Sequence, residues 1–135
     1  MTTTERRLAE LEFEPGVRVP EDTTLRSVAG VMEDTGLSCV LVGSGPPRVV
    51  TEHDLAGAVA AGLPGETPVA RVATREPVWA TMSTTVRDAV GLMTGNGIRH
   101  LVVLDPRGDV AGVVSLLDAV RWLLDPAPPA APGGP

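Results

Sequence analysis

Aromatic residues are scarce in this chain of 135 residues, which has only Trp79, Trp122 and Phe13 and no Tyr. A protein that stacks nucleic-acid bases on aromatic side chains is therefore not indicated. Basic residues are also few, because 11 Arg face 17 acidic residues and give a formal net charge of −6. This balance argues against a binder of phosphate backbones, but it stays compatible with a small anion held by a few local Arg residues.

Cys39 is the only cysteine, which excludes an intrachain disulfide and a multi-cysteine zinc site. We expect it to be an inert thiol in an apolar strand. The three consecutive residues Glu52, His53 and Asp54 point in different directions on a helix, so we expect no metal site and no required cofactor. We find no Gly-rich phosphate loop and no Ser-His-Asp or Cys-His set, so we do not expect an enzyme.

Long apolar runs are missing too. A membrane span needs roughly 18–20 apolar residues, and no run approaches that length. The first seven residues, Met1 to Arg7, lack the apolar stretch of a secretory signal. We therefore expect a cytoplasmic protein without membrane contact.

The chain does contain an internal repeat. Residues 23–42 align with residues 84–103 without a gap. In each copy apolar residues recur at the spacing of an amphipathic helix, and a glycine follows where a left-handed C-terminal cap belongs. The apolar positions are Leu25, Val28, Ala29 and Met32 in the first copy and Val86, Ala89, Val90 and Met93 in the second, and the glycines are Gly36 and Gly97.

A β-hairpin and a second helix follow each of these helices in the predicted order. The second helices are predicted from Glu52 to about Ala61 and from Leu116 to about Leu124, and a short extended segment precedes each copy. The unit is therefore β-α-β-β-α, repeated in residues 15–62 and 77–124. A helical segment (1–14) precedes the repeats, a connector (63–76) with a short helix joins them, and a Pro/Ala/Gly tail (125–135) is predicted to be disordered.

The second helix of each copy begins with a hydroxyl residue followed three residues later by Asp. The pairs are Thr51 with Asp54 and Ser115 with Asp118. Such a pair is typical of helix capping, in which the hydroxyl accepts a backbone N–H and the acid favours the positive helix end. The same groups suit a nucleotide, because a helix start attracts phosphate and a carboxylate accepts hydrogen bonds from ribose hydroxyls.

With these motifs the sequence resembles a tandem pair of CBS domains (a Bateman module), as in a stand-alone bacterial CBS-domain protein. The resemblance rests on Val49-Val50-Thr51-Glu52-His53-Asp54-Leu55, Gly112-Val113-Val114-Ser115-Leu116-Leu117-Asp118, Thr74-Arg75-Glu76-Pro77-Val78 and Gly97-Ile98-Arg99-His100-Leu101-Val102-Val103-Leu104-Asp105. It covers about residues 15–124. It implies an α/β (α+β) fold of two β-α-β-β-α repeats packed as a pseudo-twofold pair, with an adenosine-containing ligand in the cleft between them.

The resemblance also implies site residues. Asp54 with Thr51 and Asp118 with Ser115 would hold ribose and phosphate. The early strand of the opposite copy would enclose the base, which brings in Val17, Arg18 and Val19 for one site and Pro77, Val78 and Trp79 for the other. Trp79 could stack on adenine or exclude a nucleotide, but packing in the core or an interface is the favoured interpretation.

Basic residues at the start of the central strand contact phosphate in other members of the family. Arg99 and His100 occupy that place in the second copy, where Ser38 and Cys39 stand in the first. Residues 1–65 carry five Arg against ten acidic residues, and residues 66–135 carry six against seven. The two sites are therefore expected to differ. The alternative is a solvent-facing Arg beside a hydrogen-bonded His.

Two functions compete. The first is a regulatory module that senses AMP, ADP, ATP, S-adenosylmethionine or a related ligand and alters contact with an unknown partner protein. The second is a ligand-free scaffold that acts through protein–protein contacts. In either case the resemblance implies a homodimer formed through the paired helices, and Trp122 is expected at a subunit interface.

Overall fold

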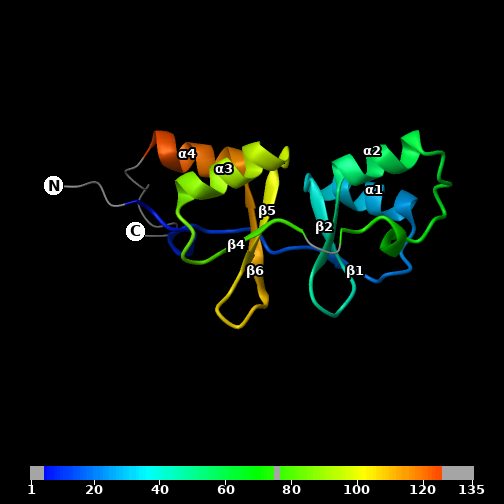
Figure 1. The fold of residues 1–135 in the computed structure, drawn as a ribbon, viewed down its shortest axis with the longest axis horizontal. Helices are drawn as coiled ribbons and strands as arrows, with labels where there is room; N and C mark the ends of the chain where they lie inside the picture. The colour runs from blue at the N-terminus through cyan, green and yellow to red at the C-terminus, as the bar shows by residue number, and fades with distance from the viewer. Residues whose placement is uncertain (1–4, 75–76, 126–135) are drawn as a thin grey trace. The chain divides into compact units, whose positions relative to one another are not determined.

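The structure, a computed structural model, describes residues 5–74 and 77–125. A short strand, a long helix, a β-hairpin and a second helix follow one another twice, as the repeat predicts (Figure 1). The first set is β1 (Arg18–Val19), α1 (Leu25–Thr35), β2 (Cys39–Val42), β3 (Arg48–Thr51) and α2 (Glu52–Ala60). The second set is β4 (Trp79–Thr81), α3 (Val86–Asn96), β5 (His100–Leu104), β6 (Val110–Ser115) and α4 (Leu116–Leu124). The predicted mixed α/β class is confirmed.

Each set forms its own three-stranded sheet, in the orders β1-β2-β3 and β4-β5-β6. The first two strands of each sheet are parallel, and the hairpin strands are antiparallel. Arg18 pairs with Leu41 in the first sheet, and Trp79 pairs with Val102 in the second. Because Val102 aligns with Leu41 in the repeat, Trp79 stands where the first copy has Arg18.

The long helices begin and end as the repeat predicts. The hydroxyls of Thr24 and Thr85 accept the N–H groups of Ser27 and Asp88 at the two helix starts. Gly36 and Gly97 end the helices at φ of +76° and +66°, in the left-handed region that glycine adopts at little cost.

Burial follows the predicted helical spacing at most positions. Helix α1 buries Leu25, Val28 and Met32, whereas the predicted position Ala29 is exposed. These side chains join a core with sheet residues and with Val69 and Ala73, which follow α2. The segment after α2 is therefore part of the first core.

The chain divides into two compact units that do not follow the order of the sequence. The first unit is residues 15–78, and the second combines the residues before 15 with those from 79 onward. We call residues 5–14 the strap. It contains a 3₁₀ turn at Leu8–Glu10, where a longer helical segment is predicted from the sequence.

The strap joins the second unit through backbone hydrogen bonds near the start of α3. The N–H of Leu8 donates to the carbonyl of Thr84 at 2.8 Å, and the N–H of Val86 donates to the carbonyl of Arg6 at 2.8 Å. The Leu8 side chain is fully buried. The Arg6 guanidinium lies 5.0 Å from the centre of the Trp122 ring, a cation–π distance.

The segment after α2 makes the same contacts with the start of α1. The N–H of Val69 donates to the carbonyl of Thr23 at 2.7 Å, and the N–H of Leu25 donates to the carbonyl of Thr67 at 2.9 Å. The short helix predicted in the connector is a 3₁₀ turn at Val69–Arg71. The predicted tail lies outside the described residues from residue 126 onward.

Candidate functional site

The start of α2 is a closed capping box. The hydroxyl of Thr51 accepts the N–H of Asp54 at 3.1 Å, and Oδ2 of Asp54 accepts the N–H of Thr51 at 2.8 Å. Both residues are half-buried. The structure therefore contains the capping arrangement that the sequence indicates, and one carboxylate oxygen of Asp54 is used in it.

The start of α4 is capped on one side only. The hydroxyl of Ser115 accepts the N–H of Asp118 at 3.0 Å. Among the described residues, the cap at this helix has no reciprocal bond from the Asp118 carboxylate to the backbone of Ser115. Instead that carboxylate lies 3.9 Å from the Arg121 guanidinium, and the Asp118 side chain is 48% exposed. The Asp118 carboxylate is therefore not part of a capping box, as that of Asp54 is, although both residues are half-buried.

The residue that precedes each central strand, β2 or β5, is hydrogen-bonded through its carbonyl to the first residue of the second helix of its unit. The carbonyl of Ser38 accepts the N–H of Glu52 at 3.0 Å, and the carbonyl of Arg99 accepts the N–H of Leu116 at 2.8 Å. Ser38 and Arg99 are therefore equivalent, as the repeat predicts. Ser38 is 5% exposed, whereas Arg99 is exposed. The basic side chain of the second unit stands where the first unit has a buried hydroxyl.

His100 and Arg99 differ in exposure, as their alternation predicts. His100 is 9% exposed and pairs directly with Ser115 across the β5–β6 ladder. The structure therefore gathers four predicted site residues of the second unit at the start of α4, namely Arg99, His100, Ser115 and Asp118.

The early-strand residues of the first unit lie at another place in its sheet. Val19 pairs with Val42, whereas Thr51 pairs with Cys39 at the opposite end of β2. Within the first unit, Arg18 and Val19 are therefore not brought to the start of α2. In the second unit, Val78 and Trp79 are half-buried, and Trp79 begins β4.

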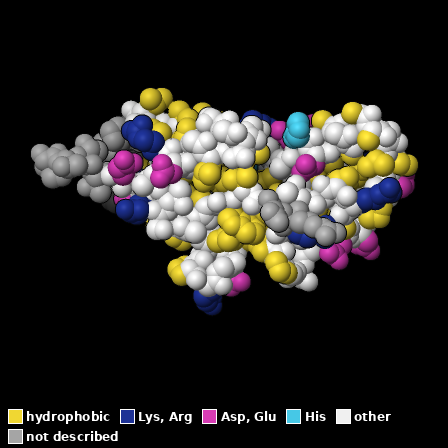
Figure 2. All heavy atoms as spheres, viewed as in Figure 1, with side chains coloured by type: hydrophobic (Ala, Val, Ile, Leu, Met, Phe, Trp, Pro, Cys, Tyr) yellow, Lys and Arg dark blue, Asp and Glu magenta, His cyan; other side chains and the backbone are white. Residues whose placement is uncertain are grey.

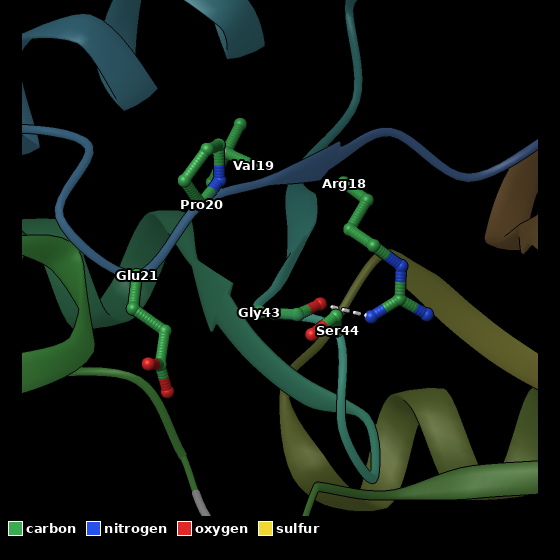
Figure 3. Close-up of a pocket in the computed structure, with 6 residues that line it drawn as sticks. All are labelled: Arg18, Val19, Pro20, Glu21, Gly43 and Ser44. Carbon is green, nitrogen blue, oxygen red and sulfur yellow. Dashed lines mark hydrogen bonds between the residues drawn. The ribbon is translucent and has the colours of Figure 1, made fainter.

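Arg18 and Val19 instead line a cavity of about 460 Å³ together with Pro20, Glu21, Gly43 and Ser44 (Figure 3). A guanidinium nitrogen of Arg18 donates to the carbonyl of Gly43, the first residue after β2. Pro20, Glu21, Gly43 and Ser44 are not among the residues predicted from the sequence. The Gly43-Ser44 turn, directly after an apolar strand, is the signal that could have indicated them.

Cys39 is buried in β2 as predicted, with 5% of its surface exposed. Burial raises the pKa of its thiol to about 11, because the surrounding apolar side chains disfavour the thiolate. Among the described residues, no group of three or more His, Cys, Asp or Glu side chains is arranged to hold a metal ion.

Charged side chains do not gather into a basic patch on the face drawn in Figure 2. There the Arg side chains of the described residues are scattered, and several lie beside acidic ones. Other Arg side chains pair with acidic side chains at the surface, as Arg26 does with Glu66 and Arg107 does with Asp105. In the part of the chain that the structure describes, no helix is long and apolar enough to cross a membrane.

Comparisons with known proteins place both repeats in one family. Residues 10–61 and 69–125 match the CBS domain. An uncharacterised 17.7 kDa protein of Acidianus ambivalens is 34% identical over 110 residues, which cover 79% of this chain and 66% of that protein. A CBS domain-containing protein of Arabidopsis thaliana is 33% identical over 129 residues, which cover 90% of this chain and 22% of that protein. The chain thus spans less than two thirds of the length of these relatives.

A solved structure agrees with these matches. A CBS domain protein of Pyrobaculum aerophilum complexed with AMP is 30% identical, with a TM-score of 0.74 over 90% of this chain and 99% of that chain. Because the family match covers both β-α-β-β-α units, this chain belongs to the CBS-domain family and carries two CBS domains in tandem.

Proposed function

We propose that this CBS pair is a regulatory module that binds an adenosine-containing ligand at the polar starts of α2 and α4. The observation that carries the proposal is the similarity to the Pyrobaculum aerophilum protein, which is complexed with AMP and matches over 99% of its own length. AMP, ADP, ATP and S-adenosylmethionine are the candidate ligands. They act as signals, and no reaction is assigned to the chain.

The second unit offers the chemistry that such a ligand needs. The Asp118 carboxylate is 48% exposed and can accept hydrogen bonds from ribose hydroxyls. The Ser115 hydroxyl and the first N–H groups of α4 form a setting that attracts phosphate. The backbone carbonyl of Arg99 accepts the N–H of Leu116 at the same helix start, which makes the Arg99 side chain a candidate phosphate contact. In the first unit, Thr51 and Asp54 occupy the equivalent positions.

The early strands would supply the apolar contacts to the base. Val19 and Val78 offer aliphatic surface, and Trp79 can stack on a purine ring. Arg18 and His100 complete the set of proposed ligand contacts. A ligand that binds only the folded protein stabilises it and can thereby change its contact with a partner protein.

A scaffold function is the second candidate, and exposed apolar side chains favour it. Val59 on α2 is 77% exposed, and Leu117 and Leu124 on α4 are 58% and 80% exposed. Contiguous exposed apolar surface marks protein–protein contact sites, and under this candidate these side chains would contribute to such a surface. A homodimer formed through these helices fits this candidate and is compatible with the first.

Thermal unfolding with each candidate ligand tests the proposal. A ligand that binds should raise the melting temperature, since binding favours the folded state. Asp118→Ala and Asp54→Ala report on the two proposed sites. Asp88→Ala is the matched control, because Thr85 and Asp88 form the same capping pair at the start of α3. No stabilisation by any adenosyl ligand, or equal loss in all three variants, would reject the proposed sites in favour of the scaffold.

A further inference from the structure

We infer that the cavity beside β1 binds a small organic monocarboxylate through Arg18 and Ser44. The cavity has a volume of about 460 Å³, which lies within the range of pockets that hold small molecules. All six lining residues belong to the first unit. The inference goes beyond the proposed function, because this ligand contains no adenosine and binds at the end of β2 that lies opposite the start of α2.

Arg18 brings a fixed positive charge to this cavity. One of its guanidinium nitrogens donates to the carbonyl of Gly43, which holds the side chain against the β2–β3 turn (Figure 3). Among the described residues, no carboxylate forms an ion pair with Arg18, and its other nitrogens have no hydrogen-bond partner. A guanidinium offers parallel N–H donors that match the two oxygens of a carboxylate. Arg18 can therefore bind a carboxylate without giving up its bond to Gly43.

Ser44 offers a second donor beside Arg18. Its side chain is exposed and lines the same cavity. In the described part of the chain, its hydroxyl has no hydrogen-bond partner. A carboxylate that accepts from Arg18 and from the Ser44 hydroxyl would thus satisfy both groups.

The acidic residue of the cavity, Glu21, is paired with a different arginine. Its carboxylate accepts a hydrogen bond from Arg48 at 3.1 Å, and Arg48 also donates to the carbonyl of Ala70 at 2.7 Å. This pair offsets the charge of Glu21 and leaves that of Arg18 to a ligand. Because Glu21 still lines the cavity, a phosphate dianion would be repelled more strongly there than a monocarboxylate.

The rest of the lining favours a short aliphatic chain on the carboxylate. Val19 is buried and Pro20 is exposed, and both present apolar atoms to the cavity. Gly43 keeps the space beside Glu21 open, because a Cβ atom at this position would lie 3.2 Å from Cγ of Glu21. A ligand of a few carbon atoms could therefore rest on Val19 and Pro20 with its carboxylate on Arg18.

The second repeat lacks this combination of side chains. In the alignment of the repeats, Trp79 stands at the position of Arg18, Met82 at that of Glu21, and Asp105 at that of Ser44. The β-α-β-β-α fold therefore forms without the charged pair. The set of Arg18, Glu21 and Ser44 is a property of the first repeat, as expected for a binding site rather than for a requirement of the fold.

NMR titration of the full chain with sodium butyrate tests the inference, with sodium chloride keeping the ionic strength constant. We expect saturable shifts of the backbone amide signals of residues 18, 19, 21, 43 and 44. Butyramide has the same size without the charge and should bind about tenfold more weakly or less, because it forms no charge-assisted hydrogen bond. Inorganic phosphate should also bind more weakly than butyrate.

Two variants locate the site. Arg18→Gln should weaken butyrate binding about tenfold or more, and Ser44→Ala should weaken it about fivefold. Arg107→Gln is the matched control, because it removes the same charge from an 83% exposed side chain in the β5–β6 turn. The comparison of butyrate with butyramide needs no variant, so it decides the outcome even if Arg18→Gln does not fold.

The inference is overturned by the absence of saturable shifts with butyrate, by equal affinities for butyrate and butyramide, or by tighter binding of phosphate. Equal effects of Arg18→Gln and Arg107→Gln would overturn it as well. Each of these results leaves the proposed function standing. Adenosine carries no carboxylate, so its effect on the melting temperature tests that function separately.

Discussion

Cys39 illustrates at the scale of one residue how burial controls reactivity. The thiolate is the reactive form, and burial raises the pKa of this thiol from 9.0 to about 11. At pH 8 we expect the folded protein to react with a thiol reagent about 100-fold more slowly than the urea-unfolded chain, from ionisation alone. The absorbance of the chromophore that the thiol reagent releases measures both reaction rates. Equal rates in the two states would contradict the buried position.

The same pKa shift predicts a loss of stability at high pH. Between pH 9 and 11 the folded state keeps the Cys39 proton while the unfolded chain releases it. The thiol's contribution is therefore fully present below pH 9 and is lost as pH rises through about 11, by about 3 kcal/mol in all. Cys39→Ala should remove this part of the pH dependence in denaturant melts.

Gly112 is a residue where no side chain fits. A Cβ atom there would lie 2.8 Å from the carbonyl oxygen of Glu14 and 3.0 Å from Cβ of Phe13. Gly112→Ala should therefore lower the free energy of unfolding by about 1–3 kcal/mol, because β6 and the strap must separate. Chemical denaturation measures the change.

Gly91→Ala is the control for this substitution. Gly91 lies inside α3 of the same unit, and a Cβ there meets nothing within 4 Å. Alanine is the better helix former, so this variant should be more stable by about 0.5–1 kcal/mol. Loss of stability in both variants, or in neither, would show that the close approach of β6 and the strap does not decide the outcome.

At the scale of elements, strong periodic signals are predicted well from sequence and weak ones are not. The helices α1 and α3 carry apolar spacing, a Thr cap and a closing Gly, and α4 has the predicted bounds Leu116–Leu124. The strap is predicted as part of a helical segment but contains only a 3₁₀ turn of three residues, which is too short to give a detectable period. In the sequence, few identities align the strap with the segment after α2, chiefly Glu5 with Glu66 and Ala9 with Ala70.

The strap acts as an element of the second core, which leads to a prediction. Leu8 is fully buried, so Leu8→Ala should lower the free energy of unfolding by about 2–5 kcal/mol. Leu124→Ala is the same substitution at a side chain that is 80% exposed, and it should change stability by less than about 0.5 kcal/mol. Urea melts of both variants would contradict the assignment if the two changes were equal.

At the scale of the whole molecule, the duplication extends to the contacts of the strap and of its counterpart, the segment after α2. Arg87 lies 4.0 Å from Glu5 in the second unit, and Arg26 lies 2.5 Å from Glu66 in the first. These pairs align in the repeat, as do the backbone bonds of Leu8 and Val69. The segment that precedes the first repeat in sequence thus belongs to the core of the second unit.

The candidate site was predictable from sequence only in part, for a physical reason. Thr51, Asp54, Ser115 and Asp118 could be found because a hydroxyl and an acid at helix spacing have a local signature. The extent to which each aspartate is used in its cap depends on carboxylate orientation, which sequence does not encode locally. The cavity beside Arg18 depends on which strand ends meet in the sheet, and Gly43 and Ser44 come to it from the turn between β2 and β3.

The discontinuous second unit gives a prediction for the whole chain. Removing residues 1–14 takes away the strap but leaves residues 15–78, which form the first unit, intact. The shortened chain loses the buried Leu8, the bridge between Glu14 and Val113, and the cation–π contact of Trp122. We therefore expect backbone amide NMR signals of residues 79–125 to lose dispersion and hydrogen-exchange protection, while those of α1, α2 and the first sheet change little.

A synthetic peptide of residues 1–14 is the decisive addition to that experiment. Because the strap binds through its own backbone hydrogen bonds and Leu8, the peptide added in excess should restore the signals of the second unit by mass action. The same peptide with Leu8→Ala should restore them poorly. If the second unit of the shortened chain stays folded without any peptide, the strap is not required for that core and the prediction is wrong. If both units unfold together, they are one cooperative structure rather than two cores of different composition.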